Sequence, residues 1–508
     1  KLMENKDMAF FSKKLATIVR DVELDFSLDK ADWLNNFNRA ETERLFKELG
    51  LYSLVKRLDE ISKLSQKEMT FLERPEPKGV IVQVQEVKTE KSIKEVLDKI
   101  SKEVAFDISD DFLNLAVAGK FYSISWPLIA GSKTLSKNFK EIFESKNIIK
   151  IGHDLKELAK FLLGYGIELD GPGFDTKLAA YLLNSDRKDY GLDRVYFDEF
   201  QENVNQDSKK NLFFILELKE KQSERLKKEK LQWLFDNIEV PTARVLAEME
   251  LRGILIDSKA IARLSKLVTL EINKLEKEIY KYAGGEFNIN SPQQLSEVLF
   301  EKLGLKGKVK KTGKGALSTA ASELEKLQDE HPIVNLILKY REVQKLKTTY
   351  IDPFPALISK TTGRLHTTFN QTGTTTGRLA SQDPNLQNIP IRTELGQEFR
   401  KAFVASPGYK LVSFDYSQLE LRIAAHISQD ETMMAAFKRG EDIHTRTAAE
   451  IFGVKPEAVD KNMRRDAKVL NFGVLYGMGV LGFQRASGVS REKAREFIDR
   501  YMNEFPGI

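Results

Sequence analysis

The chain of 508 residues contains no cysteine. This absence excludes a disulfide framework, a thiolate metal site and a thiol nucleophile, and it favours an intracellular location. Long hydrophobic runs are lacking as well. The longest uncharged stretch of interest, residues 469–484, is shorter than the ~20 apolar residues that span a bilayer, and it contains four glycines. We therefore predict neither a membrane span nor a signal peptide.

Neither sign of charge dominates the sequence. The 80 Lys and Arg residues against 75 Asp and Glu residues leave a formal net charge of +5. Any nucleic-acid surface must therefore come from local clusters of cations and not from a bulk positive field. At roughly 150 residues per domain, the length predicts about three domains and excludes a small peptide module.

The pattern of residues changes twice along the chain. Residues 1–75 have apolar positions at helical spacing and are too few for a catalytic domain. The segment RPEPKG at residues 74–79 cannot continue a helix and marks a linker. Residues 76–240 alternate short apolar runs with helical stretches, which predicts an α/β domain with a mixed sheet. Residues 241–508 form the third expected domain, which begins with long helices.

Within the α/β domain, the apolar runs predict strands near residues 80–84, 104–106, 113–117 and 121–125, and a helix near 175–183.

A basic loop interrupts the helical region that follows. Residues 304–315 contain five lysines, including Lys310 and Lys311, with four glycines and no acid. This composition suits contacts to the phosphates of a DNA backbone. A solvated basic loop without a ligand is the alternative interpretation.

The segment LVSFDYSQLELR, residues 411–422, runs from four residues of apolar, strand-type sequence into Asp415. We predict a strand that ends at Asp415 and opens into a helix. A carboxylate at a strand end can bind a divalent cation, because the sheet fixes its backbone. A structural turn is the alternative interpretation of this aspartate.

A second segment, RRDAKVLNFGVLYG at residues 464–477, repeats two cations and two aromatics at intervals of four: Arg464, Lys468, Phe472 and Tyr476. On a helix these side chains form one stripe, about 18 Å long at 1.5 Å per residue. The cationic N-terminal half suits phosphates, which the helix dipole also favours, and the aromatic half suits a sugar and a base. We predict a nucleoside triphosphate site. The alternative is an ordinary helix with exposed cations and buried aromatics.

A third segment, TTTGRLASQDPNLQNIP at residues 374–390, is rich in amide, hydroxyl and arginine donors. Such donors suit the minor groove, where every base pair presents purine N3 or pyrimidine O2 acceptors. The segment predicts sequence-independent binding of a duplex. A polar loop is the alternative.

The segments at 411–422, 464–477 and 374–390 resemble motif A, the O-helix motif and the template-primer loop of family A DNA polymerases, respectively. The segments FNINSPQQL at 287–295 and DIHT at 442–445 match the same family. From about residue 8 onward the chain resembles the bacterial DNA polymerase I type. The resemblance implies a ribonuclease-H-like, exonuclease-type α/β domain followed by a right-hand polymerase domain with thumb, palm and fingers, incomplete at its C-terminus.

The resemblance also implies a magnesium site and a nucleotide site. Asp415 would bind two Mg²⁺ ions, with the carbonyl oxygen of Tyr416 as a further ligand. Glu420 would be the steric gate that rejects the 2′-hydroxyl of a ribonucleotide. The other residues assigned to the nucleotide are His444, Arg464 and Lys468 for the triphosphate, Phe472 for the sugar and Tyr476 for the templating position. Gln418 is assigned to the nucleotide site as well, near the minor-groove residues at the primer terminus. Lys468 is assigned to catalysis as well.

The same resemblance implies a DNA-binding surface. The residues assigned to it are Arg378, Asn385 and Gln387 in the minor groove at the primer terminus, and Asn290, Lys310 and Lys311 elsewhere on the primer-template.

One catalytic part is expected outside the sequence. The family has a second carboxylate in motif C, a His-Asp-Glu turn that would lie downstream of Ile508. The sequence has one His-Asp pair, His153 and Asp154, which lies in the α/β domain without a hairpin context, so we expect it not to replace motif C. With Asp415 alone, a two-metal site is incomplete.

The α/β domain resembles the family's proofreading 3′-5′ exonuclease, but its metal ligands are replaced. Where the family has Asp-x-Glu, the chain has Asp107 and then Ser109, and where the family has Asn-x-x-x-Asp it has Asp154 and then Leu158. Asp175 keeps a structural position of the family. We expect this domain to lack exonuclease activity, because hard divalent cations need the missing carboxylates.

The leading hypothesis is template-directed DNA synthesis in replication and repair, by nucleotidyl transfer from a deoxynucleoside triphosphate to a primer 3′-hydroxyl. The main alternative is a fragment that binds primer-template and nucleotide without catalysis, because motif C is absent. A nuclease is a third, disfavoured by the lost ligands and because residues 1–75 resemble only the tail of a 5′ nuclease domain. We expect primer-template DNA and deoxynucleotides as partners, two Mg²⁺ ions, no membrane, and a monomer in the bacterial cytoplasm near the nucleoid.

Overall fold

The computed structural model describes residues 39–48, 52–55, 83–109, 111–171, 173–202, 204, 207–305, 309–310, 317–391 and 393–508. Two compact units are present, Lys1–Pro407 and Gly408–Ile508. The expected domain boundaries near residues 75 and 240 both lie within the first unit and stay predictions.

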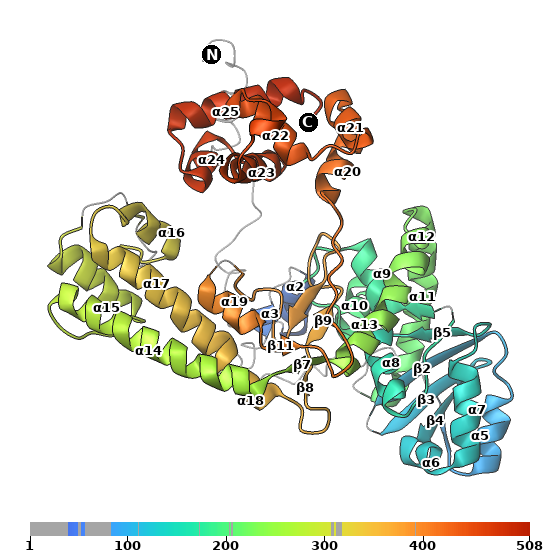
Figure 1. The fold of residues 1–508 in the computed structure, drawn as a ribbon. Coiled ribbons are helices and arrows are strands. Elements are labelled where there is room, and N and C mark those ends of the chain that lie inside the picture. The colour runs from blue at the N-terminus through green and yellow to red at the C-terminus, as the bar shows by residue number, and fades with distance from the viewer. Residues whose placement is uncertain are drawn as a thin grey trace, which may run out of the picture. The chain divides into compact units, whose positions relative to one another are not determined.

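A six-stranded mixed sheet forms the centre of the α/β domain (Figure 1). In spatial order its strands are β1 (Val84–Val87), β4 (Lys120–Ser125), β3 (Phe112–Val117), β2 (Glu103–Ser109), β5 (Ile149–Gly152) and β6 (Gly173–Asp175). Strands β2, β3 and β4 pair antiparallel, whereas β1 pairs parallel to β4 and β5 pairs parallel to β2 and β6. The expected strands at 104–106, 113–117 and 121–125 are confirmed. Of the fourth expected strand, at 80–84, residues 80–82 lie outside the described residues.

Side chains of this sheet alternate between two apolar cores, as the pleat of a strand requires. On β2, Val104 and Phe106 enter one core and Ala105 enters the other. The first core is covered by α5 (Glu90–Leu97), α6 (Trp126–Gly131), α7 (Lys133–Phe143) and α8 (Leu155–Gly164), and the second by α9 (Thr176–Leu183), α11 (Asn211–Lys228) and α13 (Val240–Arg252). The helix expected at 175–183 is therefore confirmed as α9, and the sheet is buried on both faces.

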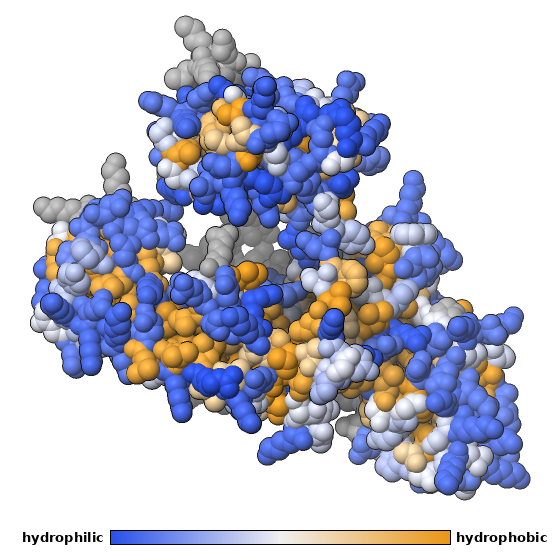
Figure 2. All heavy atoms as spheres, viewed as in Figure 1, coloured by the Kyte–Doolittle hydropathy of each residue, from blue (hydrophilic) through white to orange (hydrophobic). Residues whose placement is uncertain are grey.

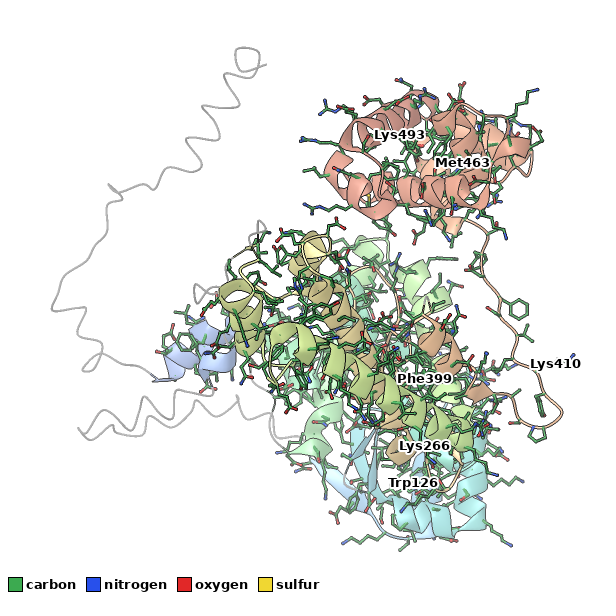
Figure 3. The ribbon with its side chains drawn as sticks, turned by 60° about the vertical axis from the view of Figure 1, so that its left-hand side comes forward. Trp126, Lys266, Phe399, Lys410, Met463 and Lys493 are labelled. Carbon is green, nitrogen blue, oxygen red and sulfur yellow. The ribbon has the colours of Figure 1, made fainter. Side chains whose placement is uncertain are left out.

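Long helices follow the α/β domain. Helix α14 (Ser258–Ala283) lies beside α17 (Pro332–Leu346), and apolar residues of both helices share one core (Figure 1). The same core contains Phe399 of α19 (Glu394–Arg400), whose ring centroid is 5.4 Å from that of Phe354 (Figure 3). The helical region expected after residue 241 is thus confirmed.

Two small sheets complete the first unit. Strand β7 (Ile254–Ile256) lies between β8 (Arg364–Leu365) and β11 (Phe403–Val404). Strands β9 (Thr368–Asn370) and β10 (Ala380–Gln382) form an antiparallel pair. The donor-rich segment 374–390 therefore begins in the connection between β9 and β10.

The second unit consists of helices around one core. They are α20 (Leu419–Ser428), α21 (Glu431–Lys438), α22 (Ile443–Phe452), α23 (Lys461–Leu475), α24 (Val480–Ser487) and α25 (Arg491–Glu504). The core contains Leu421, Met433, Leu470, Phe483 and Phe497, one from each of five helices. The face of this unit turned to the viewer in Figure 2 is mainly hydrophilic.

The strand expected at 411–414 is wrong. Residues 409–416 form neither helix nor strand, and the chain runs past Lys410 as irregular coil (Figure 3). Val412 is 68% exposed and Phe414 is 93% exposed. A strand needs a hydrogen-bonded neighbour, and in the part of the chain that the structure describes no strand pairs with this segment. The helix expected after Asp415 is present as α20.

Among the described residues, no helix combines the length and the apolar character that crossing a membrane requires.

Candidate functional site

Asp415 and Tyr416 lie in the irregular segment before α20. Both side chains are exposed, that of Tyr416 at 79%. A carboxylate and a backbone carbonyl are oxygen ligands of the kind that Mg²⁺ prefers. The described residues nevertheless contain no group of three or more His, Asp or Glu side chains that could bind a metal ion. Asp415 and Tyr416 therefore fit one side of a magnesium site, and the described residues do not complete a two-ion site.

The predicted stripe lies on α23. The carboxylate of Asp460 accepts hydrogen bonds from the backbone NH groups of Asn462 and Met463, both at 2.8 Å, and so begins this helix as its N-cap. Arg464, Lys468 and Phe472 follow at intervals of one turn, and Tyr476 comes directly after the last helical residue. The helix is confirmed. The two cations of the stripe lie in its N-terminal half, toward the positive end of the helix dipole. Its role in binding a triphosphate stays a prediction.

Arg464 is positioned by a helix cap on the neighbouring helix. Its guanidinium donates a 2.6 Å hydrogen bond to Oδ2 of Asp442, while Oδ1 of Asp442 accepts from the backbone NH of Thr445 at 2.8 Å and caps α22. Burial opposes ionisation of Asp442, but the hydrogen bonds from Arg464 and Thr445 outweigh it and lower its pKa. The arginine head therefore lies near the start of α22, which also carries His444.

His444 is buried and neutral. Only 3% of the residue is exposed, and burial, reinforced by Arg464 and Lys468, lowers its pKa to about 4 although Asp442 opposes the shift. The side-chain amide nitrogen of Asn471 lies 3.1 Å from Nδ1 of His444. Because an amide NH₂ group only donates, Nδ1 is an acceptor and the ring proton lies on Nε2. The His444 ring also lies 5.7 Å from that of Phe472.

Glu420 and Tyr476 meet at the other end of α23. The hydroxyl of Tyr476 donates a 2.8 Å hydrogen bond to Oε2 of Glu420, in the first turn of α20. Gln418 precedes this helix as its N-cap residue, with φ 56° in the left-handed region. The second unit thus brings the predicted steric gate residue into contact with the predicted templating residue.

The predicted minor-groove residues lie on exposed backbone that is fixed by internal hydrogen bonds. Gln387 accepts from the backbone NH of Ser381 at 3.1 Å and donates to the carbonyl of Leu379 at 2.9 Å. Asn385 accepts from the backbone NH of Gln387 at 2.9 Å. The amide groups of Gln387 are therefore used within the loop, whereas the side chain of Arg378 is exposed.

The remaining predicted DNA contacts are described only in part. The Asn290 amide donates to the hydroxyl of Tyr340 at 3.0 Å. Lys310 is exposed, and its backbone NH donates to Glu323 at 3.0 Å. Lys311, with most of the basic loop, lies outside the described residues.

The exonuclease-type motif residues do not form a carboxylate cluster. Asp107 on β2 accepts from the side-chain amide of Asn211 at 3.2 Å, and burial raises its pKa. Ser109 accepts from the amide of Asn114 at 3.1 Å. Leu158 packs in the core between the sheet and its helices. At the two positions where metal ligands are replaced, Ser109 therefore has a hydrogen-bond partner and Leu158 is packed in a core.

Asp175 and Asp154 also have structural contacts. The carboxylate of Asp175 accepts from the backbone NH groups of Lys177 and Leu178 in α9 and from those of Asp154 and Leu155 at the start of α8. Burial raises its pKa to about 6. Asp154 itself forms an ion pair with Lys177. One buried carboxylate thus fixes the beginnings of two helices, in agreement with the structural position expected for it.

Sequence reasoning missed Asn471 and gave no role to Asp442. The signal that could have identified the cap is the residue type, because an aspartate such as Asp442 directly before the first helical residue, Ile443, is a favoured N-cap. Nothing in the sequence marks Asn471, since its contact to His444 depends on the packing of α22 against α23.

Comparisons with known proteins identify the family of the chain. The model of "DNA polymerase family A" matches residues 258–508, and that of "DNA polymerase I, ribonuclease H-like domain" matches residues 125–209. A solved structure, described as the POL domain of Pol1 from M. smegmatis in complex with DNA primer-template and dNTP, superposes with a TM-score of 0.75 at 30% identity. The aligned region is 84% of this chain and 77% of the solved chain. The chain belongs to DNA polymerase family A. The expected ribonuclease-H-like domain followed by a polymerase domain is thereby confirmed.

Curated relatives give the same family. The thermostable DNA polymerase I of Thermus thermophilus is 49% identical over 359 residues, which are 70% of this chain and 42% of the relative. DNA polymerase I of Bacillus subtilis is 38% identical over 535 residues, covering 100% of this chain and 59% of the relative. The chain thus spans less than two thirds of these relatives.

Proposed function

We propose that the protein catalyses template-directed DNA synthesis, in which a primer 3′-hydroxyl attacks a deoxynucleoside triphosphate and releases pyrophosphate. The arrangement around α23 carries this proposal. Arg464 at the N-terminal end and the exposed ammonium of Lys468 provide donors for a triphosphate. His444 is neutral with its proton on Nε2 and would donate as well once nucleotide binding exposes its ring, which is buried here. Phe472 and Tyr476 lie further along the same stripe, where they would contact a sugar and a base.

Two Mg²⁺ ions are part of the proposal. When bound, they would activate the primer hydroxyl and neutralise the triphosphate. Asp415 and the Tyr416 carbonyl would be their ligands in this chain, joined by a second carboxylate from outside the described residues. The role of Lys468 is to place a cation beside the leaving phosphates.

DNA recognition would come from the first unit. We propose that Arg378, Asn385 and Gln387 contact the minor groove, with the Gln387 amide fixing the loop and Arg378 supplying the exposed donor. The solved relative is described in complex with primer-template and dNTP, which supports DNA and nucleotide binding by this chain. We further propose a monomer in the bacterial cytoplasm near the nucleoid, with no membrane partner.

A test compares two exposed lysines of the second unit. Lys468→Ala should reduce primer extension with Mg²⁺ and deoxynucleotides by roughly a hundredfold or more, as for removal of a group that stabilises charge in the transition state. Lys455→Ala, outside α23, should leave the rate within about twofold. Equal extension rates for the two variants would contradict the proposal that the stripe on α23 is part of the active site.

The alternative is binding of primer-template and nucleotide without catalysis. The lack of a metal-binding group among the described residues favours it. Single-turnover extension separates the two proposals: a labelled primer that binds but is never lengthened supports the alternative.

We propose in addition that the ribonuclease-H-like domain does not proofread, because Ser109 and Leu158 are engaged in structural contacts where metal ligands would be needed.

A further inference from the structure

One tyrosine of the exonuclease-type domain contacts the segment that precedes Arg378. Tyr181 lies on α9, and its hydroxyl donates a 2.8 Å hydrogen bond to the carbonyl of Thr374. The same hydroxyl accepts a hydrogen bond from the backbone NH of Gly377 at 3.0 Å. One side chain thus joins both ends of a four-residue turn. Because Tyr181 is only 2% exposed, it cannot reach a DNA duplex itself.

Hydrogen bonds within the turn add to those of Tyr181. Gly377 has φ +80°, in the left-handed region that favours glycine, and a Cβ there would meet no atom within 4 Å. Thr374 Oγ1 donates to the carbonyl of Arg378 at 2.8 Å. A cavity of about 790 Å³ borders the turn at Thr374 and Thr375. Hydrogen bonds, and not close packing on that side, therefore determine the conformation of residues 374–378.

The strand that leads into the turn is fixed to the same domain. Glu250 accepts from Nζ of Lys156 at 2.6 Å and from the backbone NH of Phe369 on β9 at 2.7 Å. Lys156 also donates to the carbonyl of Phe369 at 2.8 Å. Lys160 lies 2.7 Å from the second oxygen of Glu250. Helix α8 therefore fixes the beginning of the β9–β10 connection, while α9 fixes its turn.

We propose that Tyr181 is a positioning residue for DNA binding: its hydroxyl sets the backbone of residues 374–378 and so directs Arg378 toward the minor groove. This inference rests on the DNA-binding role proposed for Arg378. It gives the exonuclease-type domain a task that needs no metal ligand. The domain supplies the surface on which the primer-terminus loop is ordered.

The first experiment tests the positioning without DNA. Tyr181→Phe removes the hydroxyl and keeps the ring, which lies 5.8 Å from the ring of Tyr190. Amide hydrogen exchange at Gly377 should become about five- to tenfold faster, the factor expected for one lost hydrogen bond. Tyr190→Phe is the matched control, because the Tyr190 hydroxyl donates to the carbonyl of Asn184 within its own domain. Unchanged exchange at Gly377 in Tyr181→Phe would overturn the inference.

The second experiment tests whether Tyr181 acts through Arg378. Anisotropy with a fluorescent primer-template should show a Kd raised about three- to tenfold in Tyr181→Phe and unchanged in Tyr190→Phe. In an Arg378→Ala background, Tyr181→Phe should cause no further increase in the Kd. If Tyr181→Phe raises the Kd by the same factor in the Arg378→Ala background as in the parent protein, the inference is overturned. A structural defect that does not act through Arg378 would weaken DNA binding equally in both backgrounds.

The two failures can be distinguished. If Arg378→Ala binds primer-template normally, the proposed DNA role of Arg378 is wrong. Faster exchange at Gly377 would then still support Tyr181 as the residue that orders the turn.

Discussion

The hydroxyl of Tyr476 donates a hydrogen bond of 2.8 Å to Oε2 of Glu420. This contact links the end of α23 to the first turn of α20, although 56 residues separate the two in sequence. A carboxylate restrained in this way cannot rotate freely, so the space beside it has a defined boundary. This is the property that a steric gate against a ribose 2′-hydroxyl requires.

Removal of Glu420, the proposed steric gate, should relax sugar selection. Glu420→Ala is expected to raise the ratio of ribonucleotide to deoxynucleotide insertion by roughly tenfold to a hundredfold, the range for opening a pocket by one group. Tyr476→Phe keeps the carboxylate of Glu420 but removes this hydrogen bond to it, and should raise the ratio less, by about two- to tenfold. Single-nucleotide insertion rates measure both. An unchanged ratio in Glu420→Ala would remove this residue from the gate role.

Asp415 should be needed for chemistry and not for binding. Asp415→Ala is expected to abolish primer extension with Mg²⁺, while the affinity for primer-template stays within about twofold. Because the Asp415 side chain is exposed, the free energy of unfolding should change by no more than about 0.5 kcal/mol. Asp499→Ala, an exposed aspartate on α25, is the control. Turnover retained in Asp415→Ala would contradict the metal-ligand assignment.

The buried ion pair of Glu250 should matter for stability. The Glu250 side chain is 2% exposed and that of Lys156 is 9% exposed. Glu250→Gln leaves the buried Lys156 with only the exposed carboxylate of Glu157, 3.4 Å away, which should cost about 3 kcal/mol of unfolding free energy. Glu248→Gln alters an exposed residue on the same helix and should change stability by less than about 0.5 kcal/mol. Urea unfolding followed by circular dichroism makes the comparison. Equal midpoints would show that the pair contributes little.

His444 should make stability depend on pH below neutrality. Its pKa is about 4 in the folded chain, mainly because of burial, and about 6.5 when unfolded. Between these values the unfolded state binds more protons, so stability falls as the pH decreases from about 6.5 to 4, by up to about 3 kcal/mol. His153 also has its pKa lowered by burial to about 4 and acts in the same direction.

The His444→Gln variant should therefore lose less stability over this range than the parent protein. His426→Gln, an exposed position on α20, should follow the parent curve. Denaturant unfolding at a series of pH values measures the difference. Parallel curves for His444→Gln and the parent would contradict a neutral, buried His444.

Local patterns predicted helix α9 and strands β2, β3 and β4 of the α/β domain, because helical periodicity and apolar runs are properties of a few neighbouring residues. Strands β5 and β6 were not predicted. The stripe from Arg464 to Tyr476 was predictable for the same reason, since one helix fixes its geometry. The strand at 411–414 was not, because a strand depends on a partner that lies elsewhere in the chain.

Contacts between elements were beyond sequence reasoning as well. The bond from Asn471 to His444, the junction at Glu250 and the bonds of Tyr181 to the 374–378 turn all join residues from different elements. Each depends on packing that no local pattern encodes. The replaced positions Ser109 and Leu158 were visible in the sequence, but their hydrogen-bond and core partners were not.

The α/β domain should not excise nucleotides. Asp107 is half-buried and accepts a hydrogen bond from Asn211, and burial raises its pKa, so it is poorly placed to remain a free anionic ligand. Ser109 accepts from Asn114, and Leu158 occupies a core in which a carboxylate would be strongly disfavoured. A primer with a 3′ mismatch should therefore stay intact with Mg²⁺ or Mn²⁺ in the absence of nucleotides. Loss of the ligands removes the activity and does not merely slow it, because hard cations need charged oxygens. If excision occurs and Asp107→Ala abolishes it, the domain is an active nuclease and the interpretation is wrong.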